Sequence, residues 1–202
     1  MSIIKPELIE NLRSNGVVVY PTSTLPGLGC LPTKAGLDNL YKLKNRPADQ
    51  PVSLGVADIE QAAELVSVPN VAVELLRDFP VGSLTLILDA VQKLDERLGG
   101  TRVAVRVLAD HRAIELVRAI GPITATSANH SGVEPVHDTR LAAEILGLKG
   151  DSIVDGECPG GAPSTILSIE KSKIDSTNYT VTIMREGVIP RIDVETWMRN
   201  YR

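Results

Sequence analysis

The chain has 202 residues, of which 43% are hydrophobic and 23% are charged, a balance typical of a globular protein with a sizeable core. The formal net charge of −4 at pH 7 argues against a protein that coats nucleic acid by electrostatic attraction. Aromatic residues make up only 3% of the chain, so a base-stacking surface for single-stranded RNA is not expected either.

Targeting and redox signals predict a cytoplasmic protein. The N-terminal segment MSIIKPELIENLRSNG carries acidic residues and no long apolar core, so it does not resemble a signal peptide. No apolar run is long enough to span a bilayer. The two cysteines, Cys30 and Cys158, match no metal-binding spacing and need not pair. We therefore expect a reducing setting and no metal held by protein ligands.

Apolar, β-branched runs alternate with amphipathic stretches along the chain. Apolar residues at helical spacing predict a first helix at 6–14. Four residues are interpreted as N-caps of later helices: Thr33, Asp58, Asn70 and Asp110. Helices are predicted at 34–43, as two successive helices within 58–78, and at 111–119, 141–146 and 194–199. Strands are predicted at 17–20, 52–56, 84–88, 103–107, 123–127, 153–154, 165–169 and 180–184.

This alternation predicts an α/β (α+β) fold with one large twisted mixed sheet and flanking helices, in a single domain over residues 1–202. Strands separated by helices favour parallel pairs, whereas the helix pair at 58–78 and the strand-rich end favour antiparallel ones. The Gly- and Pro-rich segment 156–163 is expected to be a loop that returns the chain to the same sheet.

The loop PTSTLPGLGC follows the first strand directly. Gly27 and Gly29 suggest a dinucleotide fingerprint, but Pro32 stands where the third glycine belongs, and no P-loop sequence is present. We interpret the glycines as part of a tight strand-to-helix turn. The three hydroxyls of residues 22–24 either face a ligand or serve in turn formation and capping.

Three cations, Lys42, Lys44 and Arg46, lie within five residues and suit a polyanion such as a nucleotide triphosphate. A solvated helix C-terminus is the ordinary alternative, because cations are favourable there. Pro47 biases Arg46 away from helical geometry, and an extended stretch would project Lys44 and Arg46 to the same side. If the helix persisted instead, Lys42 and Arg46 would share a face.

A second polar cluster, with Thr126, Ser127 and Asn129, ends a later strand and supplies hydroxyl and amide groups. If the cationic run and this cluster meet in one cleft, the chain binds a phosphorylated small molecule. Arg106 lies inside the apolar strand RVAVRV, where an arginine is usually paired. Its partner is either an internal Asp or Glu, or a substrate carboxylate or phosphate held by the planar fork.

The three histidines are scattered without metal-like spacing. We expect His111 to begin a helix, and His130 and His137 to lie exposed in a loop. No Ser-His-Asp or Cys-His arrangement can be identified, so the chemistry does not require a covalent intermediate.

Taken together, these segments resemble the YrdC-like family of threonylcarbamoyl-adenylate synthases over residues 9–190. The matching stretches are GVVVYPTSTLPGLGC, LYKLKNRPADQPVSLGV, RVAVRV, ITATSANHSG, APSTILSI and MREGVIP. The family hallmark, K-x-R-P followed later by S-x-N, is present here at 44–47 and 127–129.

The resemblance implies a YrdC-like fold of the single-domain type with a concave, positive cleft. It implies synthesis of threonylcarbamoyl-AMP from L-threonine, bicarbonate or CO2, and ATP, with release of pyrophosphate. ATP would be a substrate accompanied by Mg²⁺. A downstream threonylcarbamoyl transferase would then modify the adenosine next to the anticodon of tRNA, and a weak contact with tRNA is compatible with this role.

The resemblance also implies roles for particular residues. ATP would lie among Lys42, Arg46, Ser127, Pro135 and Arg185. Threonine would lie among Thr24, Arg106, Ala125 and Ser164. The implied catalytic set is the hallmark itself, Lys44, Arg46, Ser127 and Asn129.

The chain departs from the family pattern at several positions. The family usually has an acid where Ser23 stands, an aromatic residue at Pro26, a small polar residue at Arg102 and a proline at Leu108. We expect Ser23 and Pro26 to change the shape of the amino-acid pocket and to weaken the capture of threonine relative to ATP.

The leading hypothesis is therefore an ATP-using synthase. An alternative is a YrdC-like paralogue with lost or altered activity that acts as an RNA- or ribosome-associated binding protein. The clustered cations permit this alternative, whereas the acidic balance and scarce aromatic residues count against it. A third hypothesis is an adenylate-forming enzyme that uses another amino acid.

Overall fold

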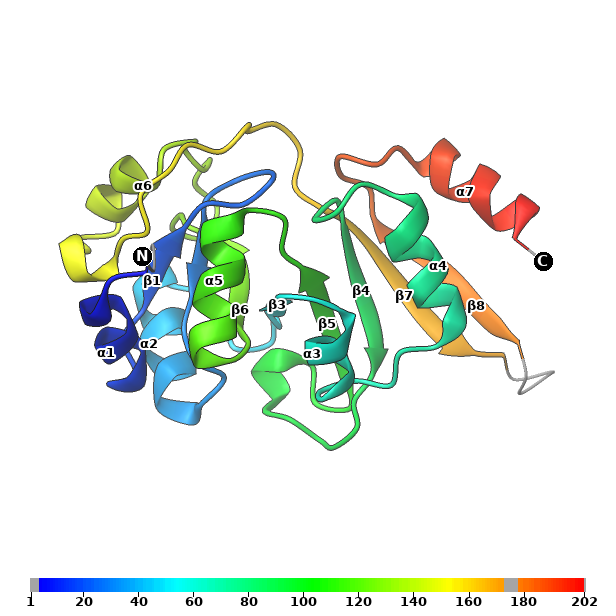
Figure 1. Cartoon of the computed structure of the whole chain (residues 1–202), viewed down its shortest axis with the longest axis horizontal. Helices are drawn as coiled ribbons and strands as arrows, with labels where there is room; N and C mark the ends of the chain where they lie inside the picture. Colours follow the sequence, from blue (N-terminus) through cyan, green and yellow to red (C-terminus); the bar gives the residue numbers. More distant parts are fainter. Residues whose placement is uncertain (1–3, 173–177, 202) are drawn as a thin grey trace.

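The computed structural model describes residues 4–172 and 178–201. In these residues the strands form one eight-stranded mixed sheet in the order β1-β2-β6-β3-β5-β4-β7-β8 (Figure 1). Strands β3 and β5 run parallel, as do β4 and β7, while the other neighbours are antiparallel. The strands are β1 Val18–Tyr20, β2 Gly27–Gly29, β3 Ser53–Val56, β4 Leu84–Asp89, β5 Arg102–Val107, β6 Ile123–Ser127, β7 Thr165–Lys171 and β8 Tyr179–Arg185. The predicted mixed α/β sheet is confirmed.

The helices begin close to the predicted caps. Thr33, Asp58 and Asp110 each accept a backbone N–H of the following first turn. The prediction for Asn70 was wrong, because Pro69 takes the cap position and Asn70 is the first helical residue. The helices are α1 Pro6–Arg13, α2 Lys34–Lys44, α3 Ile59–Ala63, α4 Asn70–Asp78, α5 His111–Ile120, α6 Thr139–Ile145 and α7 Arg191–Asn200, with short 3-10 turns η1 Glu96–Leu98 and η2 Gly150–Ser152.

Strand β2 replaces the predicted tight turn, and that prediction was wrong. Glycine is needed at positions 27 and 29 because neighbouring side chains occupy the space that a Cβ would take, not because the backbone turns there. A Cβ added to Gly27 would lie 2.6 Å from Cζ of Tyr20, and one added to Gly29 would lie 2.7 Å from Cδ1 of Ile123. Tyr20 is fully buried and donates its hydroxyl to the carbonyl of Thr124 at 3.0 Å. The ring therefore covers β2 closely and leaves no room for side chains there.

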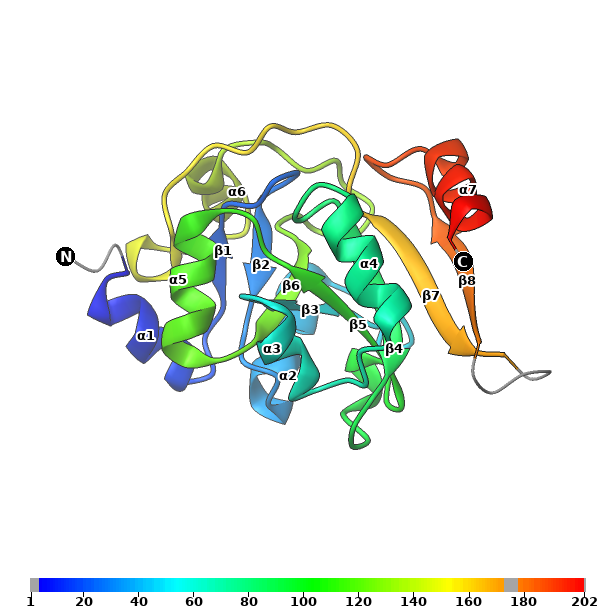
Figure 2. The same cartoon turned by 45° about the vertical axis from the view of Figure 1, so that its right-hand side comes forward.

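The predicted strand at 153–154 was also wrong. Ile153 makes only an isolated bridge to Val19. The Gly- and Pro-rich segment 156–163 does return the chain to the same sheet, since β7 pairs with β4. Figure 2 shows this segment and the one after β6 crossing the same edge of the sheet. The two are tied together by a bond from Cys158 N to His137 O of 2.9 Å.

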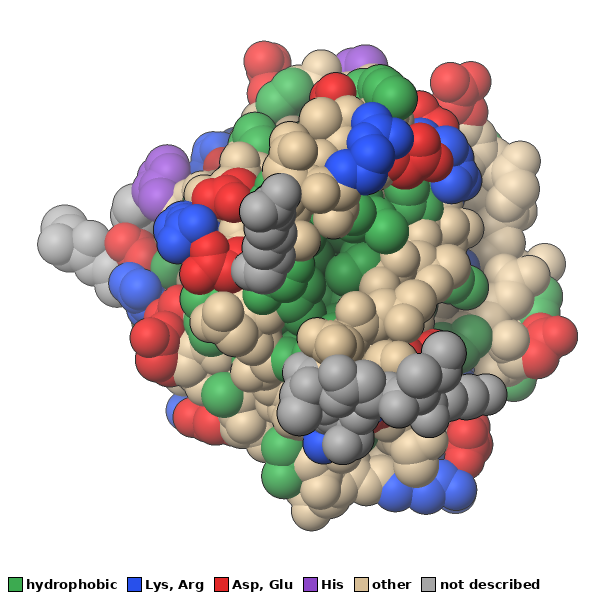
Figure 3. Space-filling view, turned by 90° about the vertical axis from the view of Figure 1, so that its right-hand side faces the viewer, with side chains coloured by type: hydrophobic (Ala, Val, Ile, Leu, Met, Phe, Trp, Pro, Cys, Tyr) green, Lys and Arg blue, Asp and Glu red, His purple; other side chains and the backbone are tan. Residues whose placement is uncertain are grey.

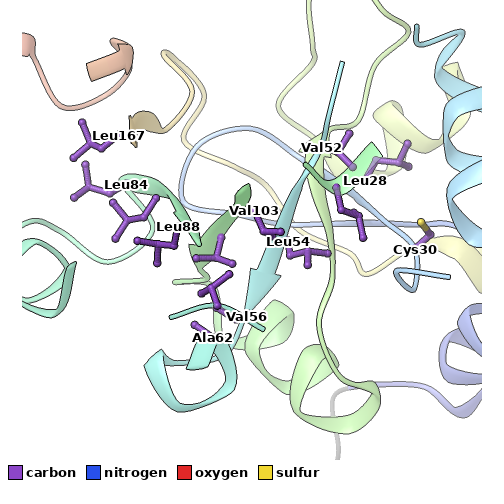
Figure 4. Close-up of a cluster of buried hydrophobic side chains, with 14 of the residues drawn as sticks. Leu28, Cys30, Val52, Leu54, Val56, Ala62, Leu84, Leu88, Val103 and Leu167 are labelled. Atoms are coloured by element: carbon purple, nitrogen blue, oxygen red, sulfur yellow. The ribbon is translucent and has the colours of Figure 1, made fainter. Parts of the chain in front are cut away.

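Two hydrophobic clusters hold the helices to the sheet. The larger one joins α2, α3, α4, α6 and α7 to most of the strands. Figure 4 shows it continuing from Leu167 and Leu84 at one end to Leu28 and Cys30 at the other. The smaller cluster packs α1 and α5 against β1 and the start of β6.

Strand alternation separates the larger core from the opposite face of the sheet. In β5, Val103 and Val105 are in the core, whereas Arg102, Ala104 and Arg106 point to the other side. Strand β4 follows the same pattern, because its residues 84, 86 and 88 are core leucines. The face opposite the core is therefore available for a site.

The outer surface carries exposed hydrophobic side chains at the β8–α7 end, among them Met184, Val188 and Ile192. Figure 3 views the molecule from this end, with hydrophobic side chains in its middle and charged ones around them. Among the residues that the structure describes, none of the helices has the length and apolar character needed to cross a membrane.

Replacing Gly27 by alanine should destabilise the protein by about 1–3 kcal/mol, because the new methyl group would overlap the buried ring of Tyr20. Urea denaturation measures the change in the free energy of unfolding. Gly150→Ala is the matched control, since a Cβ at Gly150 meets no atom within 4 Å. Equal stability of the two variants would contradict the packing argument. Tyr20→Leu should recover part of the loss when combined with Gly27→Ala.

Candidate active site

A cavity of about 920 Å³ lies on the face of β4, β5 and β7 opposite the larger core. Its volume suits a small-molecule ligand of nucleotide size. Loops after β1, after β6 and before β7 complete its walls. Its charged lining side chains among the described residues are Arg46, Arg102, Arg106, Glu134 and Arg185. Its hydroxyl groups come from Tyr20, Thr22, Thr24, Ser53, Thr85, Thr126, Ser127 and Ser164.

The structure brings most of the sequence-predicted site residues to this cavity. All four residues expected around threonine line it, namely Thr24, Arg106, Ala125 and Ser164. Four of the five expected around ATP also line it, namely Arg46, Ser127, Pro135 and Arg185. The segments that carry them are far apart in the chain, so the cavity depends on the complete sheet.

Lys42 is not brought to the cavity. It is exposed on α2 and lines a separate surface hollow with Asn39 and Leu148. The helix ends at Lys44, and Asn45 adopts a left-handed conformation with φ of 51°. Lys42 and Arg46 therefore do not share a helical face, and we leave Lys42 out of the proposed nucleotide site.

Lys44 joins the two halves of the hallmark beneath the cavity. Its side chain is only 1% exposed. The ammonium donates to the carbonyl of Ser127, to the carbonyl of Asn129 at 2.7 Å and to Oδ1 of Asn129 at 3.3 Å. The three acceptors match the three donors of an ammonium group, so Lys44 fixes the end of β6 to the end of α2 rather than lining the cavity.

Asn129 and Ser127 extend this network. The hydroxyl of Ser127 donates to Oδ1 of Asn129 at 2.5 Å, and the amide of Asn129 donates to the carbonyls of His130 and Val133. The loop after β6 is thereby folded onto the C-terminal end of α2. Ser127 lines the cavity, whereas Lys44 and Asn129 do not line it and instead hold the backbone and side chain of Ser127 in place.

Burial shifts the protonation of Lys44. Burial away from solvent and, to a smaller extent, the positive charge of Arg46 together lower the pKa of its ammonium from 10.5 to about 8. The group still carries a proton at neutral pH, which its three bonds require. Its charge therefore belongs to the site at pH 7.

Arg46 lies at the cavity wall, in the non-helical segment between the end of α2 and Pro47. Its Nε donates to the carbonyl of Gln50 at 2.8 Å, and Nη2 donates to the carbonyl of Pro51 at 3.1 Å. Both acceptors are neutral, so these bonds orient the guanidinium without neutralising it. Arg46 can therefore balance the charge of an anionic ligand.

Arg106 is 8% exposed and has neutral hydrogen-bond partners. Its Nε donates to the carbonyl of Gly82 at 2.9 Å, and Nη2 donates to the hydroxyls of Ser23 at 3.2 Å and Thr24 at 2.9 Å. None of its ion pairs or hydrogen bonds within the described residues involves an internal Asp or Glu. Burial lowers the pKa of this guanidinium, and the nearby Arg185 lowers it further. Within the described residues, Arg106 therefore does not pair with an internal Asp or Glu, which was one of the two alternatives left open by the sequence.

The hydroxyls after β1 serve both of the uses considered from the sequence. Thr22 closes a turn, because its Oγ1 donates to the carbonyl of Leu25 at 2.7 Å and accepts from Thr24 N at 3.1 Å. Thr24 accepts from Arg106, and both Thr22 and Thr24 line the cavity.

Ser23 and Pro26, which we expected to change the shape of the amino-acid pocket, do not contact the cavity directly. Pro26 is buried, and its carbonyl accepts from Ala128 N at 2.8 Å. Ser23 acts through Arg106, whose guanidinium it contacts.

Arg102 also lines the cavity, but it is held by neighbouring strands. It donates to Asp89 at 2.8 Å, to Ser168 at 2.8 Å and to the carbonyl of Ile169 at 2.9 Å. Because a carboxylate already balances its charge, Arg102 differs from Arg46 and Arg106.

Some lining residues were not found from the sequence. Thr85 and Ser53 point into the cavity, and only strand alternation opposite core residues could have indicated them. His137, expected to be exposed, is exposed and lies at the cavity. His130 was expected to be exposed but is half-buried, and its Nδ1 lies 3.1 Å from the carbonyl of Leu43. His111 begins α5 as predicted.

The relatives of similar sequence include two threonylcarbamoyl-AMP synthases. The chain is 31% identical over 189 residues to the threonylcarbamoyl-AMP synthase of Pyrococcus abyssi. The aligned region covers 91% of this chain and 54% of that protein. It is 38% identical over 164 residues to the threonylcarbamoyl-AMP synthase of Bacillus subtilis, and this aligned region covers 78% of this chain and 47% of that protein. The chain thus spans about half the length of these two relatives.

Comparison of structures gives the same relationship. The crystal structure of P. abyssi Sua5 complexed with L-threonine superimposes with a TM-score of 0.79 and 30% identity, over 93% of this chain and 55% of that one. A sequence model of the Sua5/YciO/YrdC domain, described as telomere recombination, matches residues 10–187. On this extent of matching sequence and fold, the chain belongs to the Sua5/YciO/YrdC family.

Proposed function

We propose that this chain synthesises threonylcarbamoyl-AMP from L-threonine, bicarbonate or CO2, and ATP, and releases pyrophosphate. The main support is the contact of Lys44 with Ser127 and Asn129, which unites hallmark segments 83 and 85 residues apart beside one cavity. The relatives named threonylcarbamoyl-AMP synthase support the same activity. The product would serve a downstream transferase that modifies the adenosine next to the anticodon of tRNA in the cytoplasm.

The chemistry asks for charge balance and positioning rather than a nucleophilic side chain. The amine of threonine becomes a carbamate, whose oxygen attacks the α-phosphorus of ATP while pyrophosphate leaves. The carboxylate of threonine, the new carbamate and the triphosphate of ATP are negatively charged and must be held close together. The cavity is lined by four arginines and one glutamate among the described residues, an excess of positive charge that fits this requirement. The P. abyssi relative was crystallised with L-threonine, which supports an amino-acid subsite here.

The assignment of roles follows the wall on which each residue lies. We place the triphosphate near Arg46 and Ser127, with Pro135 and Arg185 also at the nucleotide. We place the threonine carboxylate at Arg106, with Thr24, Ala125 and Ser164 around the amino acid. Lys44 and Asn129 are positioning residues, because they hold Ser127 and the loop after β6.

Mg²⁺ would arrive with the triphosphate, whose oxygens supply hard ligands for it. Among residues 4–172 and 178–201, no group of three or more His, Cys, Asp or Glu side chains could hold a metal ion. The ion would therefore be bound mainly by the nucleotide and water, and it would screen the phosphate charges that Arg46 also faces.

The function is tested by incubating the protein with ATP, Mg²⁺, labelled bicarbonate and single amino acids. Threonine-dependent release of pyrophosphate and a labelled adenylate are the expected results. Release with a different amino acid would point to an adenylate-forming enzyme of other specificity. ATP binding without any pyrophosphate release would favour the paralogue hypothesis, and RNA binding would then be measured.

Reversing the charge of Arg46 should weaken ATP binding at least about 100-fold, because a charge-assisted contact would become a repulsion. Isothermal titration of Arg46→Glu with ATP and Mg²⁺ measures this change. Arg199→Glu on the exposed side of α7 changes the net charge equally and should leave the Kd unaltered. An unchanged Kd in Arg46→Glu, with a native circular dichroism spectrum, would show that the triphosphate lies elsewhere.

Replacing Arg106 by lysine keeps the charge but removes the planar fork. The KM for threonine should rise about 10–100-fold, while the KM for ATP changes little, because Arg106 lies on the amino-acid side in our assignment. Steady-state pyrophosphate release at varied threonine and at varied ATP separates the two constants. An equal rise in both KM values would argue that Arg106 supports the whole cavity instead of one reactant.

The buried ammonium of Lys44 should titrate near pH 8. Carbon-13 labelling of lysine Cε, with Lys44→Met to assign the signal, measures this pKa by nuclear magnetic resonance. Because the folded-state pKa lies below the ordinary 10.5, the unfolded chain binds more protons than the folded one between pH 8 and 10.5. The stability of the native protein relative to Lys44→Met should therefore rise by about 2 kcal/mol from pH 7.5 to 9.5. A decrease over that range would give the opposite sign and reject the assigned pKa direction.

A further inference from the structure

Two of the stretches that carry the family resemblance, APSTILSI and MREGVIP, meet at one end of the cavity. The first contains Thr165, which begins β7, and the second contains Arg185, which ends the antiparallel strand β8 (Figure 1). Arg185 lines the cavity, and its Nη2 donates to the carbonyl of Ser164 at 2.8 Å. The pairing of β7 with β8 therefore decides where this guanidinium lies.

A shift in the register of β8 brings Arg185 to the cavity face of the sheet. The core residue Leu167 pairs with Ile183. The next residue of β7, Ile166, lines the cavity and pairs with Arg185, so Met184 is an extra residue between the two pairs. Under strict alternation Arg185 would share the face of Ile183 and point toward the core. The extra residue instead places it opposite Ile166, on the cavity face.

The hydroxyl of Thr165 fixes the chain just beyond this shift. Thr165 is fully buried, and its Oγ1 accepts from Gly187 N at 3.0 Å and from Ile189 N at 3.0 Å. The same hydroxyl donates to the carbonyl of Ile189 at 2.8 Å. A hydroxyl offers one donor and two acceptor positions, so segment 187–189 uses its whole bonding capacity. Because β8 ends at Arg185, strand pairing does not satisfy these backbone groups, and the threonine side chain does so instead.

Segment 187–189 also lies directly against the backbone that precedes β7. The N–H of Val188 donates to the carbonyl of Pro163 at 2.8 Å. A Cβ added to Gly187 would lie 2.1 Å from that same carbonyl oxygen, so the two chain segments approach as closely as a glycine allows. Ile189 then enters the larger core. The chain after Arg185 is thereby anchored by hydrogen bonds, by close packing and by burial.

We propose that Thr165 is a positioning residue for the nucleotide, because its hydroxyl anchors segment 187–189 and so keeps Arg185 on the cavity face. Thr165 is not among the residues that line the cavity, so it acts through Arg185 and does not touch a ligand. This inference rests on the proposed function, which places Arg185 at ATP.

The amino-acid side of the cavity does not depend on this hydroxyl. Ser164, which we place at threonine, has its own hydroxyl partner in Thr85 at 2.8 Å. The backbone N–H of Thr165 donates to the carbonyl of Ser83 at 2.9 Å, a bond that any residue except proline keeps. Loss of the Thr165 hydroxyl should therefore disturb the binding of ATP and leave the binding of threonine nearly unchanged.

Thr165→Val and Thr165→Ser separate the hydroxyl from the shape of the side chain. Isothermal titration with ATP and Mg²⁺ should show about tenfold weaker binding for the valine variant, because Arg185 is no longer fixed. The serine variant keeps the hydroxyl and should bind ATP within about twofold of the native protein. An unchanged Kd in a folded Thr165→Val variant would overturn the proposal.

Thr139→Val is the matched control for a purely structural effect. Thr139 is also fully buried, its hydroxyl accepts from Gly156 N at 2.8 Å, and it does not line the cavity. Its replacement should lower the free energy of unfolding without altering the Kd for ATP. Equal weakening of ATP binding in the two valine variants would show that lost stability, and not the position of Arg185, is responsible.

A double-mutant cycle tests whether Thr165 acts through Arg185. Arg185→Met removes the guanidinium, so adding Thr165→Val to it should weaken ATP binding no further. A further loss as large as in the native background would contradict positioning through Arg185. In steady-state assays of Thr165→Val, the KM for ATP should rise while the KM for threonine stays nearly constant, and an equal rise in both would also contradict it.

Gly187→Ala provides a second test if Thr165→Val does not fold, as judged by circular dichroism. The added methyl group would overlap the carbonyl of Pro163 and displace the segment that Thr165 holds. ATP binding should weaken, and a native Kd in this variant would overturn the proposal.

Pyrophosphate release separates this inference from the proposed function. Weaker ATP binding in Thr165→Val that disappears in the Arg185→Met background would support the positioning role, even if the native protein releases no pyrophosphate with threonine. Threonine-dependent pyrophosphate release by the native protein, with an unchanged Kd for ATP in Thr165→Val, would support the synthase and refute the positioning role.

Discussion

The buried ammonium of Lys44 is the interaction on which the site depends. An ammonium that is 1% exposed must satisfy its three donors inside the protein, or its burial would cost several kcal/mol. Its acceptors belong to Ser127, the last residue of β6, and to Asn129, two residues later. The backbone N–H of Ser131 also donates to the carbonyl of Lys44 at 2.9 Å. Helix α2 and the loop after β6 are therefore fixed to each other, and Arg46 and Ser127 are held on adjoining walls.

Strand alternation gives the sheet two different faces, and the cavity uses the one that the larger core leaves open. Val103 and Val105 bind β5 to the core, and the same strand presents Arg106 on the opposite side. An arginine can be held there because backbone carbonyls and hydroxyls surround it. Such acceptors orient a guanidinium but leave its charge available, which is the property that recognition of an anionic reactant needs.

The arginines of the cavity therefore fall into two kinds. Arg102 is linked to Asp89 and joins three neighbouring strands, so it mainly strengthens the sheet at the end of the cavity. Arg46, Arg106 and Arg185 have neutral partners in the described residues and are the cations that a ligand can engage. Ser23 gives Arg106 a neutral hydroxyl as acceptor, whereas a carboxylate at this position would balance the charge of that guanidinium. The selectivity of the site thus depends on which guanidiniums the protein neutralises itself.

The sequence by itself determined the mixed sheet, three of the four helix caps that it indicated, and a set of site residues most of which line the cavity, because apolar periodicity, Asp and Thr caps and the spaced hallmark are local signals. Pro47 correctly indicated that the helix ends before Arg46. Only the tertiary structure showed that Gly27 belongs to a strand, since the ring of Tyr20 rather than a turn excludes a side chain there. It also separated Lys42 from Arg46 and turned Lys44 away from the cavity. Those outcomes are set by which distant carbonyls and hydroxyls meet each cation after the sheet has formed, and no local pattern encodes them.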